Sequence, residues 1–425
     1  MTNQKTYKAI KASIFNPIDL ELSDFFDNGL LIYDNDGKIV YCGNYDSCPY
    51  DKEILQLIDY SDSYIIPGLI DTHTHLPQVS AIGLGSGKLL EWLENYIFPL
   101  EKKFTDLDFA YSQSEFFFNS MLKSGTTTAA IYSALDLEST NIAFAVANES
   151  KIRAYIGSPL MDLPNNSQYY QSIDANINKM NKILSKWHKF TNKLELVVTP
   201  RFAGSCSFDL LKYAGDFANQ NNLIIQTHIS ENISELAFIK NLHPNFKNYT
   251  DIYYSAGLLT DRTLLAHSIY LNNNEINLIK TQNCTICHCP TSNRYLSSGV
   301  MPLMNYLEMD MKIALGTDVA GGFSLSVINE MKEAIENTKI YNIFNNSEKV
   351  LKPQNSLYLA TKAGATALNN DKIGSLENDK YADFVVLKPN FQFNDLNSTE
   401  ILGKIIYSQN LFDINSVYIQ GEKII

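Results

Sequence analysis

Eight short apolar runs alternate with longer amphipathic stretches through the middle of this 425-residue chain. Most of these runs are apolar throughout, which is typical of parallel strands that are buried on both faces. Strands and helices that alternate in this way predict an α/β fold with a (β/α)8 TIM-like barrel. The expected strands are residues 64–70, 126–133, 153–158, 194–199, 223–227, 263–266, 284–287 and 312–315, and the expected helices include 107–123, 172–190, 208–219 and 274–281.

Both ends of the chain show a different pattern, in which short strands are separated by turns. Residues 29–43 indicate a hairpin, because two alternating apolar runs flank Asn35, Asp36 and Gly37. Residues 382–389 and 414–425 are also rich in strand-forming side chains. We expect the ends, residues 1–65 and 371–425, to pair into one small β-sandwich domain beside a barrel of residues 66–370.

Charge and composition exclude several classes of function. A formal net charge of -12 would repel a polyanion, so nucleic acid is not an expected partner. The chain has no run of about 18 apolar residues, and its first residues, MTNQKTY, lead into no signal peptide. Six cysteines in a chain of this length do not indicate a disulfide framework. We therefore expect a cytoplasmic protein that acts on a small molecule and does not bind membranes.

The first predicted strand leads into two histidines. His73 and His75 follow it in IIPGLIDTHTH, and a spacing of two points both rings the same way from an extended segment. Reactive side chains of such barrels lie at the C-terminal ends of the strands, and zinc takes histidine nitrogens as ligands. The pair therefore predicts a metal site, and the alternative is two surface histidines on a loop.

Three further strand ends carry candidates for the same site. His228 could be the third ligand, and Glu231, three residues later, could move protons without binding the metal. His267 could be a ligand or could hold the water that the ion activates. Asp318 could bind the metal and accept the proton of that water. The alternatives are a core histidine for His228, a helix-dipole residue for Glu231 and a capping residue for Asp318.

Side chains for the substrate are expected near the remaining strand ends. Gln78 can donate to and accept from the edge of a heterocycle, Arg201 can donate to a carbonyl oxygen, and Phe202 offers a ring for stacking. Their alternatives are a turn residue, a salt bridge at the barrel rim and a core aromatic residue. A two-metal site often has a modified lysine after the fourth strand. That strand ends VVTPRF, so we expect one metal ion.

The segment CTICHCP contains Cys284, Cys287, His288 and Cys289 and could suggest a zinc knot. Such a site normally needs a second, separated ligand pair, which the sequence lacks, so a buried strand is the better prediction. His188 and His243 lie in polar surroundings and are expected at the surface.

Several motifs together resemble a known superfamily. PGLIDTHTH, HISE, AHS and GTDVAGG, in this order, resemble the amidohydrolase superfamily. Finer features from about residue 65 onward resemble its guanine deaminase family. They are DTHTHLPQ, LLEWLENYIFPLEKKF, GTTTA, VTPRF, QTHISEN, NYTDIY and HCPTSNRYLSSG. One departure is segment 81–93, which looks shorter than the family pattern and bears on the pocket entrance.

The resemblance implies an enzyme with one Zn²⁺ per subunit that hydrolyses guanine to xanthine and ammonia in purine catabolism or salvage. It also implies a homodimer. The implied zinc ligands are His73, His75, His228 and Asp318. The implied catalytic residues are Glu231, which protonates the purine ring, Asp318, and His267, which orients the water on zinc. The implied substrate contacts are Gln78, Arg201, Phe202, His228, Glu231 and Asp318.

Two other functions remain open from the sequence. Related enzymes act on other purines, pterins or triazines, or displace halide from their substrates. A non-catalytic relative would have lost metal ligands, whereas all of the expected ligands are present in this chain.

Overall fold

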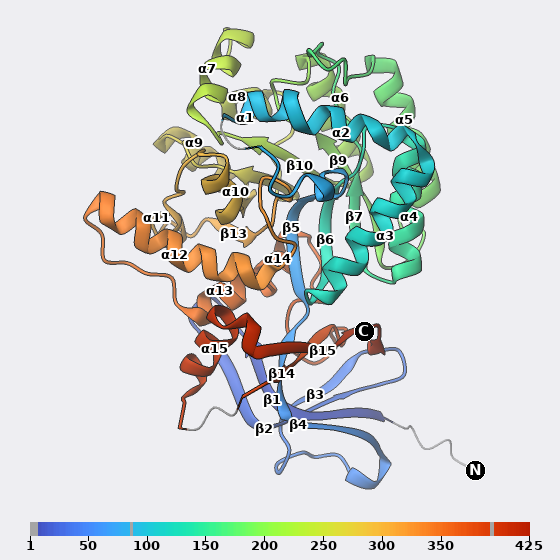
Figure 1. Cartoon of the computed structure of the whole chain (residues 1–425), viewed down its shortest axis with the longest axis vertical. Helices are drawn as coiled ribbons and strands as arrows, with labels where there is room; N and C mark the ends of the chain where they lie inside the picture. Colours follow the sequence, from blue (N-terminus) through green and yellow to red (C-terminus); the bar gives the residue numbers. More distant parts are fainter. Residues whose placement is uncertain (1–6, 86–87, 392–394) are drawn as a thin grey trace.

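Eight parallel strands form the barrel in the computed structural model, which describes residues 7–85, 88–391 and 395–425 (Figure 1). They lie in chain order around the barrel, with the short strand β8 (Pro159–Leu160) paired to β9. The (β/α)8 prediction is confirmed. The strands are β5 (Leu69–His75), β6 (Thr126–Tyr132), β7 (Arg153–Gly157), β9 (Leu194–Pro200), β10 (Ile224–Ile229), β11 (Thr263–His267), β12 (Thr285–His288) and β13 (Lys312–Leu315).

The first barrel strand begins later than predicted. Residues 64–67 end strand β4 (Leu55–Pro67) of the other sheet, and β5 starts at Leu69. Proline lacks the N–H that a continuing strand would use, and the N–H of Gly68 donates instead to the carbonyl of Asp383 at 2.9 Å. The single strand expected over residues 64–70 was therefore wrong. As a consequence, His73 and His75 lie within β5 itself.

Close backbone approach completes the barrel between β13 and β5. The hydroxyl of Thr72 donates to the carbonyl of Leu315 at 2.8 Å, and the N–H of Asp318 donates to the carbonyl of His73 at 2.8 Å. A Cβ at Gly316 would lie 2.7 Å from the Cβ of His73. The chain therefore uses glycine where the last strand passes the histidine pair.

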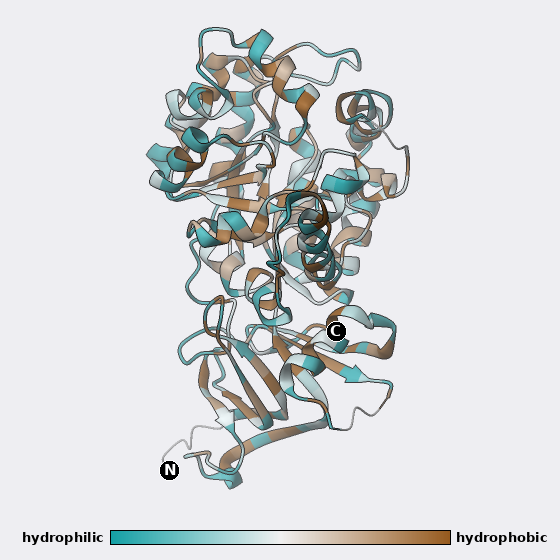
Figure 2. Cartoon of the chain, turned by 90° about the vertical axis from the view of Figure 1, so that its left-hand side faces the viewer, coloured by the Kyte–Doolittle hydropathy of each residue, from teal (hydrophilic) through white to brown (hydrophobic). Residues whose placement is uncertain are grey.

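Helices cover the outside of the barrel. The helix predicted over residues 107–123 is confirmed with the same bounds, and the other three differ by a few residues at their ends. Figure 2 shows that apolar residues are concentrated in the strands and on the helix faces that cover them. The main helices are α3 (Leu107–Lys123), α4 (Leu137–Ser150), α5 (Ile173–Trp187), α6 (Phe208–Asn221), α7 (Ile233–Leu242), α8 (Tyr249–Ser255), α9 (Asn273–Thr281), α10 (Pro290–Tyr295), α11 (Leu303–Glu308) and α12 (Val327–Asn345).

After the barrel, the chain adds α13 (Pro353–Leu359) and α14 (Lys362–Ala367) and returns to the first strands, with α15 (Ser398–Tyr407) beside them (Figure 1). One seven-stranded sheet joins both ends in the order β16-β15-β14-β4-β1-β2-β3. Its further strands are β1 (Tyr7–Pro17), β2 (Ser23–Tyr33), β3 (Ile39–Asn44), β14 (Phe384–Pro389), β15 (Phe412–Ile419) and β16 (Glu422–Lys423). The expected hairpin is β2–β3, and antiparallel pairing of β14 with β4 confirms that the ends meet.

A buried ion pair links the barrel to the returning chain. Arg153, at the start of β7, lies 3.2 Å from Asp383, just before β14. The second oxygen of Asp383 accepts from the N–H of Gln420 at 2.6 Å. Among the described residues, none of the helices has the length and apolar character that crossing a membrane requires.

Candidate active site

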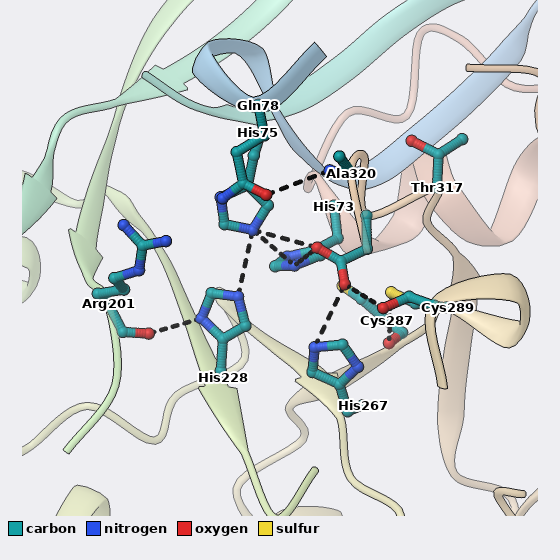
Figure 3. A network of polar contacts seen from close by, with 12 residues as sticks. His73, His75, Gln78, Arg201, His228, His267, Cys287, Cys289, Thr317 and Ala320 are labelled. Atoms are coloured by element: carbon teal, nitrogen blue, oxygen red, sulfur yellow. Dashed lines mark hydrogen bonds and ion pairs between the residues drawn. The ribbon is translucent and has the colours of Figure 1, made fainter. Parts of the chain in front are cut away.

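The C-terminal ends of the barrel strands bring four predicted metal ligands together (Figure 3). The Nε2 atom of His75 lies 3.3 Å from Nε2 of His73 and 3.2 Å from Nε2 of His228. Oδ1 of Asp318 lies 3.2 Å from Nε2 of both His73 and His75. The ligand atoms of all four residues lie within 4.8 Å of one another. One small ion can therefore touch all four.

The donor chemistry of this cluster fits zinc. The Nδ1–H of His228 donates to the carbonyl of Arg201 at 2.6 Å, which leaves the Nε2 lone pair facing the cluster. Burial lowers the pKa of His75 to about 4 and holds the pKa of His228 well below its usual range. Both rings are therefore neutral, as metal binding requires. Three nitrogens and one carboxylate oxygen are ligands that zinc accepts.

Asp318 holds its two carboxylate oxygens in different surroundings. Oδ1 faces the ligand histidines, whereas Oδ2 accepts from the hydroxyl of Ser292 at 2.6 Å and lies 3.7 Å from Nε2 of His267. Burial acts to raise the pKa of Asp318, but hydrogen bonds from His73 and His75 hold it well below its usual range. Asp318 is therefore ionised, as a metal ligand requires, and its Oδ2 points away from the ligand histidines toward Ser292 and His267.

Glu231 and His267 lie beside each other next to the cluster. Oε2 of Glu231 lies 3.4 Å from Nε2 of His267, and Oε1 accepts from the hydroxyl of Ser298 at 2.8 Å. The Nδ1–H of His267 donates to the side-chain oxygen of Asn293 at 2.8 Å. Burial, together with the charge of Asp318, raises the pKa of Glu231 to about 8. Glu231 therefore carries a proton at neutral pH.

The side chains expected to hold the substrate line the same cavity as the cluster. Gln78, Arg201 and Phe202 lie on its walls together with Glu231. Arg201 also forms the salt bridge that the sequence left open, with Glu101 at 2.7 Å. The partner is a buried helical carboxylate, so Arg201 lines the cavity and makes the salt bridge at once.

The C-terminal part of segment 81–93, residues 89–93, lies along one side of the cavity. Leu89, Trp92 and Leu93 line it, and the indole N–H of Trp92 donates to the carbonyl of Leu84 at 2.9 Å. The hydroxyl of Tyr295 donates to the carbonyl of Gly85. The shortening of this segment relative to the family stays a prediction, and residues 86 and 87 lie outside the described residues.

Four residues at the site were missed by reasoning from strand ends. All four lie on helices: Trp92 on α1 (Leu89–Trp92), Glu101 on α2 (Phe98–Lys102), and Ser292 and Asn293 on α10. The available signal was the family motifs themselves, since LLEWLENYIFPLEKKF contains the first two and HCPTSNRYLSSG contains the others. Strand position could not reveal them.

The remaining candidates are not among the four grouped ligands. Thr285–His288 of the segment CTICHCP form the buried strand β12, and the cysteines Cys284, Cys287 and Cys289 of this segment are free. His188 and His243 are half-buried rather than fully exposed. Each ring bonds to the backbone, His188 to the N–H of Leu196 and His243 to the carbonyl of Ala203.

Comparison with known proteins agrees with this geometry. The model of the amidohydrolase family matches residues 64–424. The chain belongs to the amidohydrolase family. The motifs predicted the same family, and the matched residues include the entire barrel.

Within the amidohydrolase family, the chain is similar to guanine deaminases. It is 32% identical to that of Dictyostelium discoideum, over 100% of this chain and 99% of that protein. The guanine deaminase of Homo sapiens is 35% identical, over 85% of this chain and 83% of that protein. The structure of guanine deaminase from C. acetobutylicum with bound guanine in its active site has a TM-score of 0.92 and 31% identity, covering 99% of this chain and 100% of that one.

Proposed function

We propose that this chain is a hydrolase of C–N bonds in cyclic amidines that converts guanine to xanthine and ammonia. The observation that carries the proposal is the placement of four metal-ligand atoms within 4.8 Å of one another at a cavity lined by Gln78, Arg201 and Phe202. The relative with guanine bound in its active site supports guanine as the substrate, since its structure covers 99% of this chain.

We infer that His73, His75, His228 and Asp318 hold one Zn²⁺ per subunit. A zinc ion bound there lowers the pKa of a water toward neutrality. The fourth strand supports a single ion, because Arg201 stands directly after it and the sequence VVTPRF contains no lysine to bridge two metals.

The acids of the site then have separate tasks. His267 orients the attacking water. The oxygen of this water bonds to C2 of guanine, while Oδ2 of Asp318 accepts one of the protons of the water. Glu231, which is protonated at neutral pH, donates its proton to the ring nitrogen beside C2. The bond between C2 and the exocyclic amino nitrogen breaks, Asp318 gives its proton to the departing amine, and the proton of the hydroxyl on C2 returns to Glu231. These transfers balance guanine and water against xanthine and ammonia.

Arg201 and Phe202 favour a flat base with an oxygen at position 6. A guanidinium donates to a 6-oxo group, whereas the 6-amino group of adenine would place one donor against another. The ring of Phe202 can stack on the base.

The test is ammonia release by purified, zinc-loaded protein from guanine, adenine, a pterin and a triazine, with the metal content measured in the same sample. We expect one zinc per subunit and turnover of guanine in preference to the others. Faster turnover of another ring than of guanine would assign that ring as the substrate. Protein that neither binds zinc nor releases ammonia would contradict the proposal that this chain is an enzyme.

We also propose a cytoplasmic homodimer that acts in purine breakdown or salvage, with residues 1–65 and 371–425 forming the small domain beside the barrel of residues 66–370. The resemblance to guanine deaminases supports the dimer. Light scattering on the purified protein tests it, with twice the mass of one chain as the expected result.

A further inference from the structure

A buried carboxylate stands behind the two polar side chains expected to hold the base. Glu101 lies on helix α2 (Phe98–Lys102) and is 1% exposed. It contacts both Arg201 and Gln78, each of which lines the cavity. These two residues come from strand ends far apart in the sequence, so Glu101 is the point at which they are joined.

Arg201 is held in one plane by this helix. Its two terminal nitrogens donate to the two oxygens of Glu101, at 2.7 Å and 3.0 Å. The guanidinium also lies 5.0 Å from the ring centroid of Phe98, three residues before Glu101 and on the same helix face. A guanidinium has five N–H donors, and this pairing uses two of them. The remaining N–H groups therefore point in fixed directions, in which a ligand can accept from them.

Gln78 is held in one amide orientation by the same carboxylate. Its Nε2 donates to Glu101 at 2.9 Å, and its Oε1 accepts from the N–H of Ala320 at 3.1 Å. A flip of the amide would place donor against donor at Ala320 and acceptor against acceptor at Glu101. One N–H and one oxygen lone pair therefore remain, in fixed positions, for a ligand.

The ion pair also makes this wall of the cavity electrically neutral. Arg201 and Glu101 are both buried, and their charges cancel. Among the described residues, the other titratable groups facing them include Tyr169, next to Glu101, and Tyr132 and His75, next to Arg201. Burial holds the pKa of both phenols well above their usual range, so both are neutral. An anionic ligand therefore gains no net attraction from the Glu101–Arg201 pair itself.

We propose that Glu101 is a positioning residue that sets substrate selectivity, by fixing the donors of Gln78 and Arg201 and by cancelling the charge of Arg201. The inference rests on the proposed deamination of guanine. Hydrolysis adds a second carbonyl group to the ring, which makes xanthine a stronger acid than guanine. A neutral wall binds the neutral substrate and releases the product once the product ionises.

The experiment compares wild-type protein with Glu101→Gln, which keeps the size of the side chain and removes its charge. Glu115→Gln is the matched control, because Glu115 is an exposed acid on α3 that does not line the cavity. The readouts are zinc content, kcat and KM for guanine, and inhibition by xanthine on both sides of its acid ionisation.

For Glu101→Gln we expect full zinc content and a fall in kcat/KM on the order of 100-fold, since a buried charge pair has lost one partner. Inhibition of the wild type by xanthine weakens as xanthine ionises. In Glu101→Gln the uncompensated Arg201 attracts the anion, so inhibition strengthens instead, by about tenfold relative to the wild type. A purely structural role would not reverse this pH dependence.

A double variant tests whether Glu101 changes xanthine inhibition through the charge of Arg201. In a background of Arg201→Gln, the change Glu101→Gln should leave the pH dependence of xanthine inhibition unaltered, because no charge remains to be balanced. If Glu101→Gln does not fold, Glu101→Asp takes its place. It must keep the wild-type pH dependence of inhibition while raising KM for guanine.

Two results would overturn the inference. They are wild-type kinetics with unchanged xanthine inhibition in zinc-loaded Glu101→Gln, and a reversed pH dependence in Glu101→Asp, which keeps the charge. Failure of the proposed function is a separate outcome. It appears in the wild type, as absence of ammonia release from guanine, before any variant is compared.

Discussion

The hydroxyl of Ser292 lies 2.6 Å from Oδ2 of Asp318, the carboxylate oxygen that does not face His73 and His75. Ser292 is buried on α10, and it contacts Asp318 through the oxygen that does not face the ligand histidines. The oxygen proposed to carry the proton is therefore held by a helix, while the other oxygen is held by the histidines of β5. This division lets one carboxylate bind metal and move a proton.

Replacement of Ser292 by alanine should slow turnover without loss of metal. A hydrogen bond to a charged group contributes about 1.5–3 kcal/mol, so we expect kcat to fall at least about tenfold. Zinc content should match the wild type, and the exposed Ser112→Ala on α3 serves as the control. Wild-type kcat in zinc-loaded Ser292→Ala would show that Oδ2 needs no such partner.

Replacement of Glu231 by glutamine should keep zinc and remove nearly all turnover. The amide has the shape of the carboxylic acid, but it has no proton to donate to the purine ring. We expect kcat to fall by about 100-fold or more. The measurement is ammonia release at saturating guanine together with zinc analysis, and a variant that turns over like the wild type would rule out the acid role.

The pH profile should reflect the same carboxyl group. Burial and the charge of Asp318 raise the pKa of Glu231 to about 8, so the proton-donating form is present below that pH and disappears above it. We therefore expect kcat/KM for guanine to fall as pH rises through about 8. A kcat/KM that continues to rise above this pKa would contradict the assignment.

Removal of the metal with a chelator should abolish turnover and lower Tm by several degrees. The ligand atoms of His73, His75, His228 and Asp318 lie within 4.8 Å of one another, so an ion that binds them stabilises the folded state over the unfolded chain. Added zinc should restore both activity and Tm. Unchanged activity after complete, verified metal removal would exclude the zinc proposal.

Lys179 should make stability depend on pH. In the charged form its ammonium group donates to the carbonyls of Leu135 and Pro159, at 2.9 Å and 3.0 Å, and to the side chain of Gln171 at 3.1 Å. Burial lowers the pKa of Lys179 from 10.5 to about 7. Between these pH values the unfolded chain binds a proton that the folded protein has lost. The free energy of unfolding therefore rises with pH, by up to about 1.4 kcal/mol per unit.

The comparison for Lys179 uses urea unfolding of wild type and Lys179→Met across this pH range. We expect the free energy of unfolding not to rise with pH in Lys179→Met. The rise should persist in Lys182→Met, which removes an exposed lysine from the same helix. Equal slopes for all three proteins would mean that Lys179 stays charged in the folded state.

The sequence by itself determined the barrel and the metal cluster. Parallel strands of one barrel end at the same rim, so residues placed after separate apolar runs, such as His228 and Asp318, must meet there. The same reasoning misplaced the first strand. Residues 64–67 are as apolar as the barrel strands, and only the pairing of β4 with β1 and β14 shows that they belong to the other sheet.

Only the tertiary structure decided which groups stand behind the cluster. The chain has 46 acidic residues, and no periodicity marks Glu101 as the partner of Arg201, because the two residues meet through the packing of α2 against the end of β9. The proton that Glu231 carries is decided in the same way. Its raised pKa comes from burial and from the nearby charge of Asp318, and both exist only once the barrel has closed.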